Sequence, residues 1–394
     1  MMISIALAGK PNSGKSTFFK AATLSDVEIA NYPFTTIDAN HGIAYLRVEC
    51  PCQKLHIQHC TSCVNGVRFV PVQLVDVAGL VPDAHLGRGL GNEFLDELSR
   101  VDLIIHVVDA SGGTDIVGNP INIGEHNPVE DIAFLEQEID LWIFNILHRN
   151  WHRISRKTEI ENLAIEHAIA EQLGGIRVDD RQVRAALSRL NIQTNKPGNW
   201  SDDELKGLIT EIRKMNKPII IAANKTDVAP EENIKQLKNV DCRAFFVSSA
   251  AELALRMAAK KDIITYLPGD KDFTINSTNL NKAQEKGLEQ LKRFVRQNNG
   301  TGVQECINNA VFDVLGQIVV YPVEDENKYS DKNGRVLPDA FVVGSNCTAR
   351  ELAYMVHTDI GKSFLFGIDV KSKMRISDKH QLKNGDVIKI VSTK

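Results

Sequence analysis

The feature that most constrains this chain is the run GKPNSGKS at residues 9–16, which follows the apolar run ISIALA at residues 3–8. Its glycines, Gly9 and Gly14, allow the backbone to curl so that its N–H groups surround a phosphate. The residues that follow, STFFKAA at 16–22, have a helical pattern. The sequence therefore predicts a phosphate-binding P-loop between a strand and a helix.

The side chains of this loop fit a magnesium-bound nucleotide. We expect the Lys15 ammonium to reach the terminal phosphates and the Ser16 hydroxyl to ligate Mg²⁺. The residues expected to surround the phosphates are Gly9, Pro11, Asn12, Ser13, Gly14, Lys15, Ser16 and Thr17.

Other apolar runs predict an α/β fold with a mostly parallel sheet. These runs lie at residues 3–8, 70–78, 101–110, 218–225 and 243–250. Strands that are apolar throughout are typical of sheets covered by helices on both faces. Stretches with helical spacing separate several of them, as such a sheet requires.

Three units are expected along the chain. Residues 127–216 have helical spacing and exceed the dozen or so residues of a crossover helix, which predicts an inserted helical domain. The α/β domain is then split between residues 1–126 and 217–316. Residues 317–394 predict a small α+β domain, with short strands around a helix that Thr348 and Glu351 cap.

The run DVAG at residues 76–79 predicts the part of the site that faces the terminal phosphate. Asp76 follows an apolar strand and can stand behind the magnesium ion as a carboxylate. Gly79 can donate its backbone amide to the γ-phosphate. We therefore assign Ser16 and Asp76 to magnesium and Gly79 to the reacting phosphate.

The run NKTD at residues 224–227 predicts that the base is guanine. The carboxylate of Asp227 can accept hydrogen bonds from both N1–H and N2–H of guanine, a pair that adenine does not offer. Lys225 would cover the base, and the run SSA at residues 248–250 would place an amide on the guanine oxygen. The residues expected at the base are Asn224, Lys225, Asp227, Ser249 and Ala250.

Three motifs together resemble those of the Obg-related GTPases, specifically the YchF-like branch in its archaeal form. They are NYPFTT at 31–36, DVAGLV at 76–81 and GRGLGNEFL at 87–95. The resemblance covers nearly the whole chain, including the helical insertion and a C-terminal segment similar to the ubiquitin-like TGS domain, a β-grasp fold. It implies that Thr36 closes on Mg²⁺ and the γ-phosphate, and that residues 79–91 form a second switch.

The resemblance does not by itself show whether the nucleotide is GTP or ATP, or whether it is hydrolysed. Better-known YchF members have an altered base motif and favour ATP, whereas NKTD favours GTP here. We expect a slow GTP-hydrolysing switch, in which water attacks the γ-phosphate in line, with Lys15, Thr36, Asn12 and Gly79 as the catalytic residues. The alternatives are an ATPase and a nucleotide sensor without catalysis that acts on a ribosomal partner.

A potassium ion is a candidate cofactor for hydrolysis. Leu80 stands where many GTPases carry a glutamine that positions water, and an aliphatic side chain cannot do this. In related GTPases with a hydrophobic residue here, a P-loop asparagine binds a potassium ion, and Asn12 occupies that position. The alternative is that Asn12 only hydrogen-bonds to its own loop.

A zinc ion is a second candidate. Cys50, Cys52, Cys60 and Cys63 follow the pattern C-x-C-x7-C-x2-C, and tetrahedral zinc accepts four thiolates from two such short pairs. Free or paired thiols are the alternative. His56 and His59 could each replace a ligand, although a histidine between strands is more often a surface residue.

Charge and hydropathy limit the partners. The net charge of −4 gives no overall attraction to nucleic acid. The local basic stretch HRNWHRISRK at residues 148–157 predicts one basic helix face for RNA, or else an ordinary solvated face. Together with the TGS resemblance it suggests a ribosome or RNA partner. No membrane segment is apparent, so we expect a cytoplasmic protein. We also expect it to be a monomer.

Overall fold

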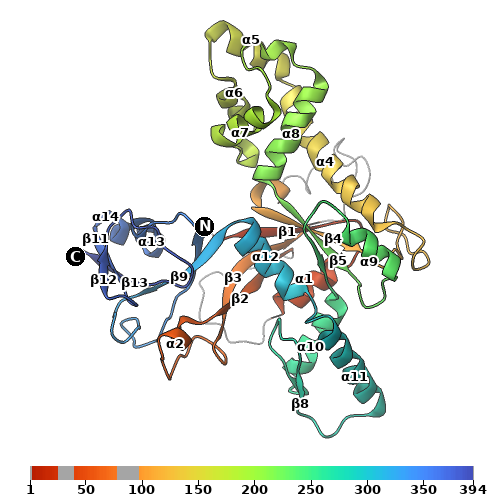
Figure 1. Cartoon of the computed structure of the whole chain (residues 1–394), viewed down its shortest axis with the longest axis vertical. Helices are drawn as coiled ribbons and strands as arrows, with labels where there is room; N and C mark the ends of the chain where they lie inside the picture. The colour runs from red at the N-terminus through yellow and green to blue at the C-terminus, as the bar shows by residue number, and fades with distance from the viewer. Residues whose placement is uncertain (1, 25–39, 78–96, 394) are drawn as a thin grey trace.

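The computed structural model describes residues 2–24, 40–77 and 97–393 (Figure 1). Its centre is a six-stranded sheet with the order β2-β3-β1-β4-β5-β6. The strands are β1 (Ser4–Ala8), β2 (His41–Glu49), β3 (Val67–Asp76), β4 (Leu103–Asp109), β5 (Ile219–Asn224) and β6 (Ala244–Phe246). All neighbours are parallel except β2 and β3, which are antiparallel. The prediction of a mostly parallel α/β sheet is confirmed.

Both faces of this sheet are covered. Successive residues of a strand point to opposite faces, so Leu7 packs with Phe18 of helix α1, whereas Ala8 packs with Ile139 of helix α4. β1 and β4 are buried throughout. The helices of this unit outside the arm are α1 (Lys15–Thr23), α2 (Pro51–Lys54), α9 (Glu231–Lys238), α10 (Ser249–Lys260), α11 (Lys282–Gln297) and α12 (Val303–Asn309).

A helical arm projects from the sheet at the top of Figure 1. Its helices are α4 (Pro128–His148), α5 (Trp151–Glu161), α6 (Ile165–Gln172), α7 (Asp180–Leu190) and α8 (Asp202–Asn216). Buried side chains such as Ile143, Ile169 and Leu208 form its core. Ser201 and Glu204 cap α8 reciprocally, as their spacing requires.

The basic stretch 148–157 does not form one helix. α4 ends at His148 and α5 begins at Trp151, so Arg149 lies in the junction between them. Trp151 is buried and stacks on Trp200 with ring centroids 5.2 Å apart. The expectation that the whole stretch lies on one helix is therefore wrong, although Arg153, Arg156 and Lys157 are all exposed on α5.

The C-terminal domain is a second sheet with the order β10-β9-β13-β11-β12. Its elements are β9 (Gln317–Val323), β10 (Phe341–Gly344), α13 (Ala349–Val356), α14 (Thr358–Lys362), β11 (Phe364–Asp369), β12 (Met374–Ile376) and β13 (Val387–Ser392). β9 and β13 are parallel, and the other pairs are antiparallel. The predicted cap of α13 is confirmed, since Thr348 and Glu351 form both hydrogen bonds of a capping box.

Two short elements complete the description. A hairpin of β7 (Ile264–Thr265) and β8 (Thr274–Ile275) lies with α11 at the bottom of Figure 1. A π-helical turn, Ala310–Val314, connects α12 to β9. Among the helices that the structure describes, none combines the length and the apolar character needed to cross a bilayer.

Candidate nucleotide site

The predicted P-loop connects the end of β1 to the start of α1. Gly14 precedes the helix with φ 99°, and Gly9 has φ 143°. A Cβ on Gly9 would lie 2.4 Å from the Val107 carbonyl oxygen, and one on Gly14 would lie 2.2 Å from the Asn224 side chain. Only glycine fits at either position, which explains why the loop needs both.

The Lys15 side chain lies against the backbone of this loop. Its ammonium donates to the carbonyl oxygens of Gly9 at 3.0 Å and Lys10 at 2.9 Å. Burial lowers the pKa of Lys15 to about 8, and the nearby carboxylate of Asp76 opposes this only in part. A bound phosphate would stabilise the charged ammonium, so the site favours an anion at this point.

Ser16 and Asp76 lie together beside the loop. The Ser16 hydroxyl donates to an Asp76 carboxylate oxygen at 3.0 Å. Burial raises the pKa of Asp76, while the Ser16 hydrogen bond and Lys15 oppose the rise. Hydroxyl and carboxylate oxygens are the donors that Mg²⁺ prefers, so this pair fits the predicted magnesium ion.

The base motif after β5 is attached directly to the P-loop. The Asn224 amide donates to the Ser13 carbonyl oxygen at 3.1 Å, and the same side chain accepts from the Ser249 backbone amide at 3.0 Å. The Lys225 ammonium lies 2.9 Å from the Asn12 carbonyl oxygen and 2.8 Å from Asp109. The phosphate loop and the base motif are thus parts of one site.

Asp227 lies beyond this contact, at the exposed end of the motif. The Ser248 hydroxyl donates to one of its carboxylate oxygens at 2.7 Å, and that hydroxyl also accepts from the Ala251 amide at the start of α10. Each carboxylate oxygen has two lone pairs, so Asp227 keeps capacity for two further donors. Ser249 is buried here and Ala250 is exposed.

Several supporting residues were not predicted from the sequence. Lys10 is buried and forms an ion pair of 2.8 Å with Asp131 of α4, which also lies 2.8 Å from His126. Asp109 accepts from Ser111 in addition to Lys225. Asp109 could have been found, because it ends an apolar strand as Asp76 does. Lys10 and Asp131 are 121 positions apart, and no local signal connects them.

A buried histidine lies beneath the P-loop. His106 belongs to β4, and its Nδ1 has no hydrogen-bond partner among the described residues. Burial lowers the pKa of His106 to about 3, and the positive charges of Lys15 and Lys10 add to the shift. It is therefore neutral and adds no positive charge to the site.

The Asn12 side chain points to a neighbouring loop. Its amide donates to the Gly118 carbonyl oxygen at 3.0 Å, which leaves the Asn12 side-chain oxygen as the group available to a cation. Thr36, Gly79 and Leu80 lie outside the described residues, so their predicted roles stay predictions.

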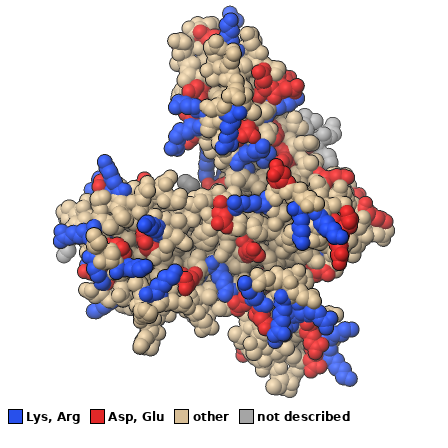
Figure 2. Space-filling model, in the orientation of Figure 1, with Lys and Arg blue, Asp and Glu red and all other residues tan. Residues whose placement is uncertain are grey.

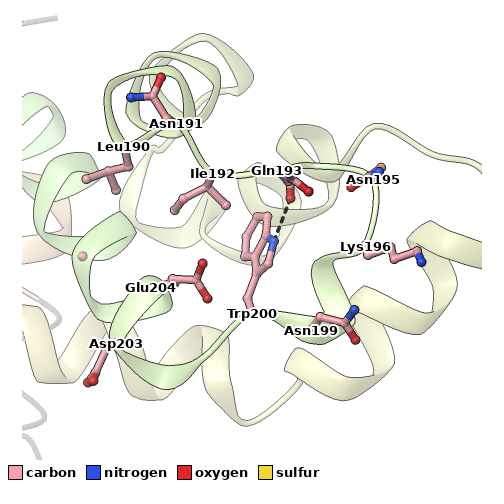
Figure 3. Close-up of a pocket in the computed structure, with 11 residues that line it drawn as sticks. Leu190, Asn191, Ile192, Gln193, Asn195, Lys196, Asn199, Trp200, Asp203 and Glu204 are labelled. Carbon is pink, nitrogen blue, oxygen red and sulfur yellow. Dashed lines mark hydrogen bonds between the residues drawn. The ribbon is translucent and has the colours of Figure 1, made fainter.

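A separate hollow lies on the helical arm (Figure 3). It encloses about 640 Å³ between the ends of α7 and α8. Trp200 stands at its centre and donates to the Gln193 carbonyl oxygen at 2.9 Å. None of the predicted nucleotide residues lines this hollow, so it is distinct from the site at the sheet.

The sheet, the P-loop and the base motif define a P-loop nucleotide-binding protein of the GTPase class. Family models agree along the chain. A 50S ribosome-binding GTPase model matches residues 4–145, an Obg-like GTPase YGR210-like G4-motif model matches residues 222–325, and a TGS model matches residues 334–392.

Relatives extend this likeness to the full length. The chain is 47% identical to an uncharacterized GTP-binding protein of Methanocaldococcus jannaschii, covering 99% of both chains. It is 30% identical to the ribosome-binding ATPase YchF of Bacillus subtilis, covering 74% of both. The crystal structure of a GTP-binding protein from Pyrococcus horikoshii matches with a TM-score of 0.78 at 39% identity, covering 99% of this chain and 100% of that one. The chain belongs to the YchF-like branch of the Obg-related GTP-binding proteins.

Proposed function

We propose that this protein binds GTP, hydrolyses it to GDP and phosphate, and uses the two states as a switch in contact with the ribosome or its RNA. The observation that carries the proposal is the double contact of Asn224 with Ser13 and Ser249. It fixes Asp227 and the start of α10 relative to the phosphate loop. A guanine base and a triphosphate can therefore be recognised together.

The residues of the site suggest how hydrolysis would proceed. Lys15 and the P-loop amides would stabilise negative charge as it develops on the phosphates. Ser16, with Asp76 behind it, would hold Mg²⁺, which supplies further positive charge when bound. Water would attack the γ-phosphate in line, with Thr36 and Gly79 predicted at that phosphate.

ATP is the competing substrate, because the Bacillus subtilis relative is named an ATPase. The Asp227 carboxylate favours guanine, since it offers acceptors to two donors that adenine lacks. We expect GTP to bind about 100-fold or more tightly than ATP, in line with two charge-assisted hydrogen bonds.

An Asp227→Asn variant tests the base contact. An amide offers one donor and one acceptor, which match the C2 carbonyl and N1–H of xanthine. We expect GTP affinity to fall and xanthosine triphosphate affinity to rise, measured by equilibrium titration, with Asp241→Asn as an exposed control. If the parent protein binds ATP as tightly as GTP, the guanine assignment is wrong.

Potassium should accelerate hydrolysis through Asn12. The side-chain oxygen of Asn12 remains available beside the P-loop, while its amide donates to Gly118. Phosphate release should be faster in potassium than in sodium, and Asn12→Ala should remove the difference with little change in GTP affinity. Equal rates in both salts would remove potassium from the mechanism, and a complete lack of turnover would favour the sensor.

The ribosomal partner is supported by two observations. The matching GTPase model and the Bacillus subtilis relative both carry ribosome-binding descriptions. Figure 2 shows Lys and Arg side chains over the C-terminal domain, where Lys371, Lys373 and Arg375 are exposed. The Arg375 guanidinium lies 4.4 Å from the Phe366 ring, a cation and an aromatic side chain that both suit RNA.

Co-sedimentation with ribosomal subunits tests this part. Binding should be tighter with a non-hydrolysable GTP analogue than with GDP, and should weaken as salt rises. Replacement of Arg153 and Arg156 by Gln should reduce the salt slope, because each lost phosphate contact releases one fewer counterion. If the affinity for ribosomal subunits depends neither on salt concentration nor on the bound nucleotide, the partner is a protein and not RNA.

A further inference from the structure

The four cysteines of residues 50–63 meet in one cluster. The Sγ atoms of Cys50 and Cys60 are 3.8 Å apart, those of Cys52 and Cys63 are 3.6 Å apart, and all four lie within 4.8 Å of one another. Zinc–sulfur bonds of about 2.3 Å in a tetrahedron place sulfur atoms about 3.8 Å apart. A disulfide requires about 2.05 Å, so these thiols are free but arranged as a metal would hold them.

We propose that one Zn²⁺ is bound by Cys50, Cys52, Cys60 and Cys63. We further propose that residues 50–66, which we call the zinc knuckle, form the surface to which the C-terminal domain binds. This site lies at the opposite end of β2 and β3 from the nucleotide. It does not depend on the function proposed above.

The zinc knuckle has little apolar core of its own. Of residues 50–66 only Cys50, Pro51 and Cys52 are buried, and the one helix, α2, is a single turn. Its backbone hydrogen bonds lie mostly around α2, and a further one runs from the Cys50 amide to the Gly66 carbonyl oxygen at 2.8 Å. A bound metal contributes folding free energy directly and would replace the missing core.

The donor set selects the metal. Four thiolates in tetrahedral reach suit zinc and do not suit the hard cations Mg²⁺ or Ca²⁺. His56 and His59 are exposed, and neither belongs to the group of possible ligands. The geometry therefore favours the four cysteines, and not a histidine, as the zinc ligands.

The zinc knuckle and the strand after it hold the C-terminal domain. The Ser62 hydroxyl donates to the Val336 carbonyl oxygen at 2.8 Å. The buried guanidinium of Arg68 donates to the carbonyl oxygens of Leu337 and Pro338. Arg68 also lies 5.7 Å from the centre of the Tyr321 ring. In Figure 1, α2 of the zinc knuckle lies next to the blue C-terminal domain.

Apolar packing continues across the same contact. Cys50, Cys52, Leu337 and Val387 belong to one cluster of buried residues, and Leu55, Ile57, Cys60 and Cys63 pack against it. The sulfur atoms are thus close to the boundary between the two units. A metal that fixes their positions also fixes the surface that Ser62 and its neighbours present.

Metal analysis of the full-length protein, purified without chelator, tests the site. We expect about one zinc per chain, falling below about 0.1 in the double variant Cys60→Ser with Cys63→Ser. Cys242→Ser, outside the cluster, should keep its zinc. Cys60→His should also keep it, because imidazole is a zinc ligand. Cobalt(II) exchange should give the visible absorption of tetrahedral thiolate coordination. Absence of bound metal, or iron in place of zinc, would overturn the assignment.

Hydrogen exchange tests the docking role. After removal of zinc by a chelator, the amides of residues 329–340 should exchange faster, while GTP affinity stays the same and shows that the P-loop domain is folded. The same protein with zinc added back serves as the matched control, and the protection of this segment should then return. If zinc leaves and this segment keeps its protection, the metal site stands and the docking role is wrong.

Discussion

The two ends of β3 carry two different kinds of site. At its last residue, Asp76 contacts Ser16 of the nucleotide site. Near its first residue, Arg68 contacts the C-terminal domain beside the zinc knuckle. The eight residue steps from Arg68 to Asp76 separate the two by roughly 26 Å. The nucleotide site at the Asp76 end is built from short sequence motifs. The site at the Arg68 end is built from contacts between segments that are distant in sequence.

This difference shows how a single strand can contribute to nucleotide binding at one end and to domain docking at the other, with separate sets of interactions. The nucleotide end depends on backbone amides, glycine geometry and a few charged side chains. The other end depends on burial, on backbone carbonyl acceptors and on four sulfur atoms. A substitution at the nucleotide end should therefore change mainly nucleotide affinity, and one at the other end should change mainly the stability of the domain contact.

The largest effect should come from Lys15. Replacement by methionine keeps the length of the side chain but removes the charge that meets the terminal phosphates. GTP affinity should fall about 100-fold or more, measured by equilibrium titration, while thermal stability of the C-terminal domain is unchanged. Lys20→Met, an exposed position on the same helix, is the control. A loss of less than tenfold would contradict the role of Lys15.

Arg68→Ala should give the second largest effect, at the other end of the strand. The buried carbonyl oxygens of Leu337 and Pro338 would lose their donor, which should cost about 2–4 kcal/mol of unfolding free energy. Denaturant unfolding followed by far-UV circular dichroism measures it, since all three tryptophans lie in the helical arm.

The control for Arg68 is Lys54→Ala, which removes an exposed ion pair with Glu49 and should cost less than about 0.5 kcal/mol. GTP affinity of Arg68→Ala should match that of the parent. A large loss of GTP affinity would show that the two ends of β3 are coupled after all.

The smallest effect should be the pH dependence of nucleotide binding. In the free protein the pKa of Lys15 is lowered to about 8 by burial, and bound phosphates should raise it. The complex then holds more protons than the free protein above pH 8. GTP affinity should therefore fall as pH rises past about 8, by at most tenfold for each pH unit.

The Lys15→Arg variant sharpens this last measurement. A guanidinium stays charged throughout, so its profile should show only the titration of the guanine base itself. Titrations of both proteins from about pH 7 to about pH 9 should diverge above 8. Parallel profiles would mean that Lys15 is already fully charged in the free protein.

The sequence predicted some elements well and missed others for identifiable reasons. Apolar runs found β1, β3, β4, β5 and β6, because strands covered on both faces contain few polar residues. β2 was missed, since one of its faces is only partly buried and its pattern alternates. In the C-terminal domain β10, β11 and β12 were missed, because they are short and partly exposed.

By itself the sequence determined the class of the protein, the P-loop, the base motif and the four-cysteine pattern. These depend on residue types at short spacing, and the local backbone is sufficient to bring such residues together. Only the tertiary structure decided that Asn224 joins the base motif to the P-loop, that Lys10 pairs with Asp131, and that Arg68 and the zinc knuckle hold the C-terminal domain. Such contacts join segments that are distant in sequence, and only the folding of the sheet and its covering helices brings them into reach.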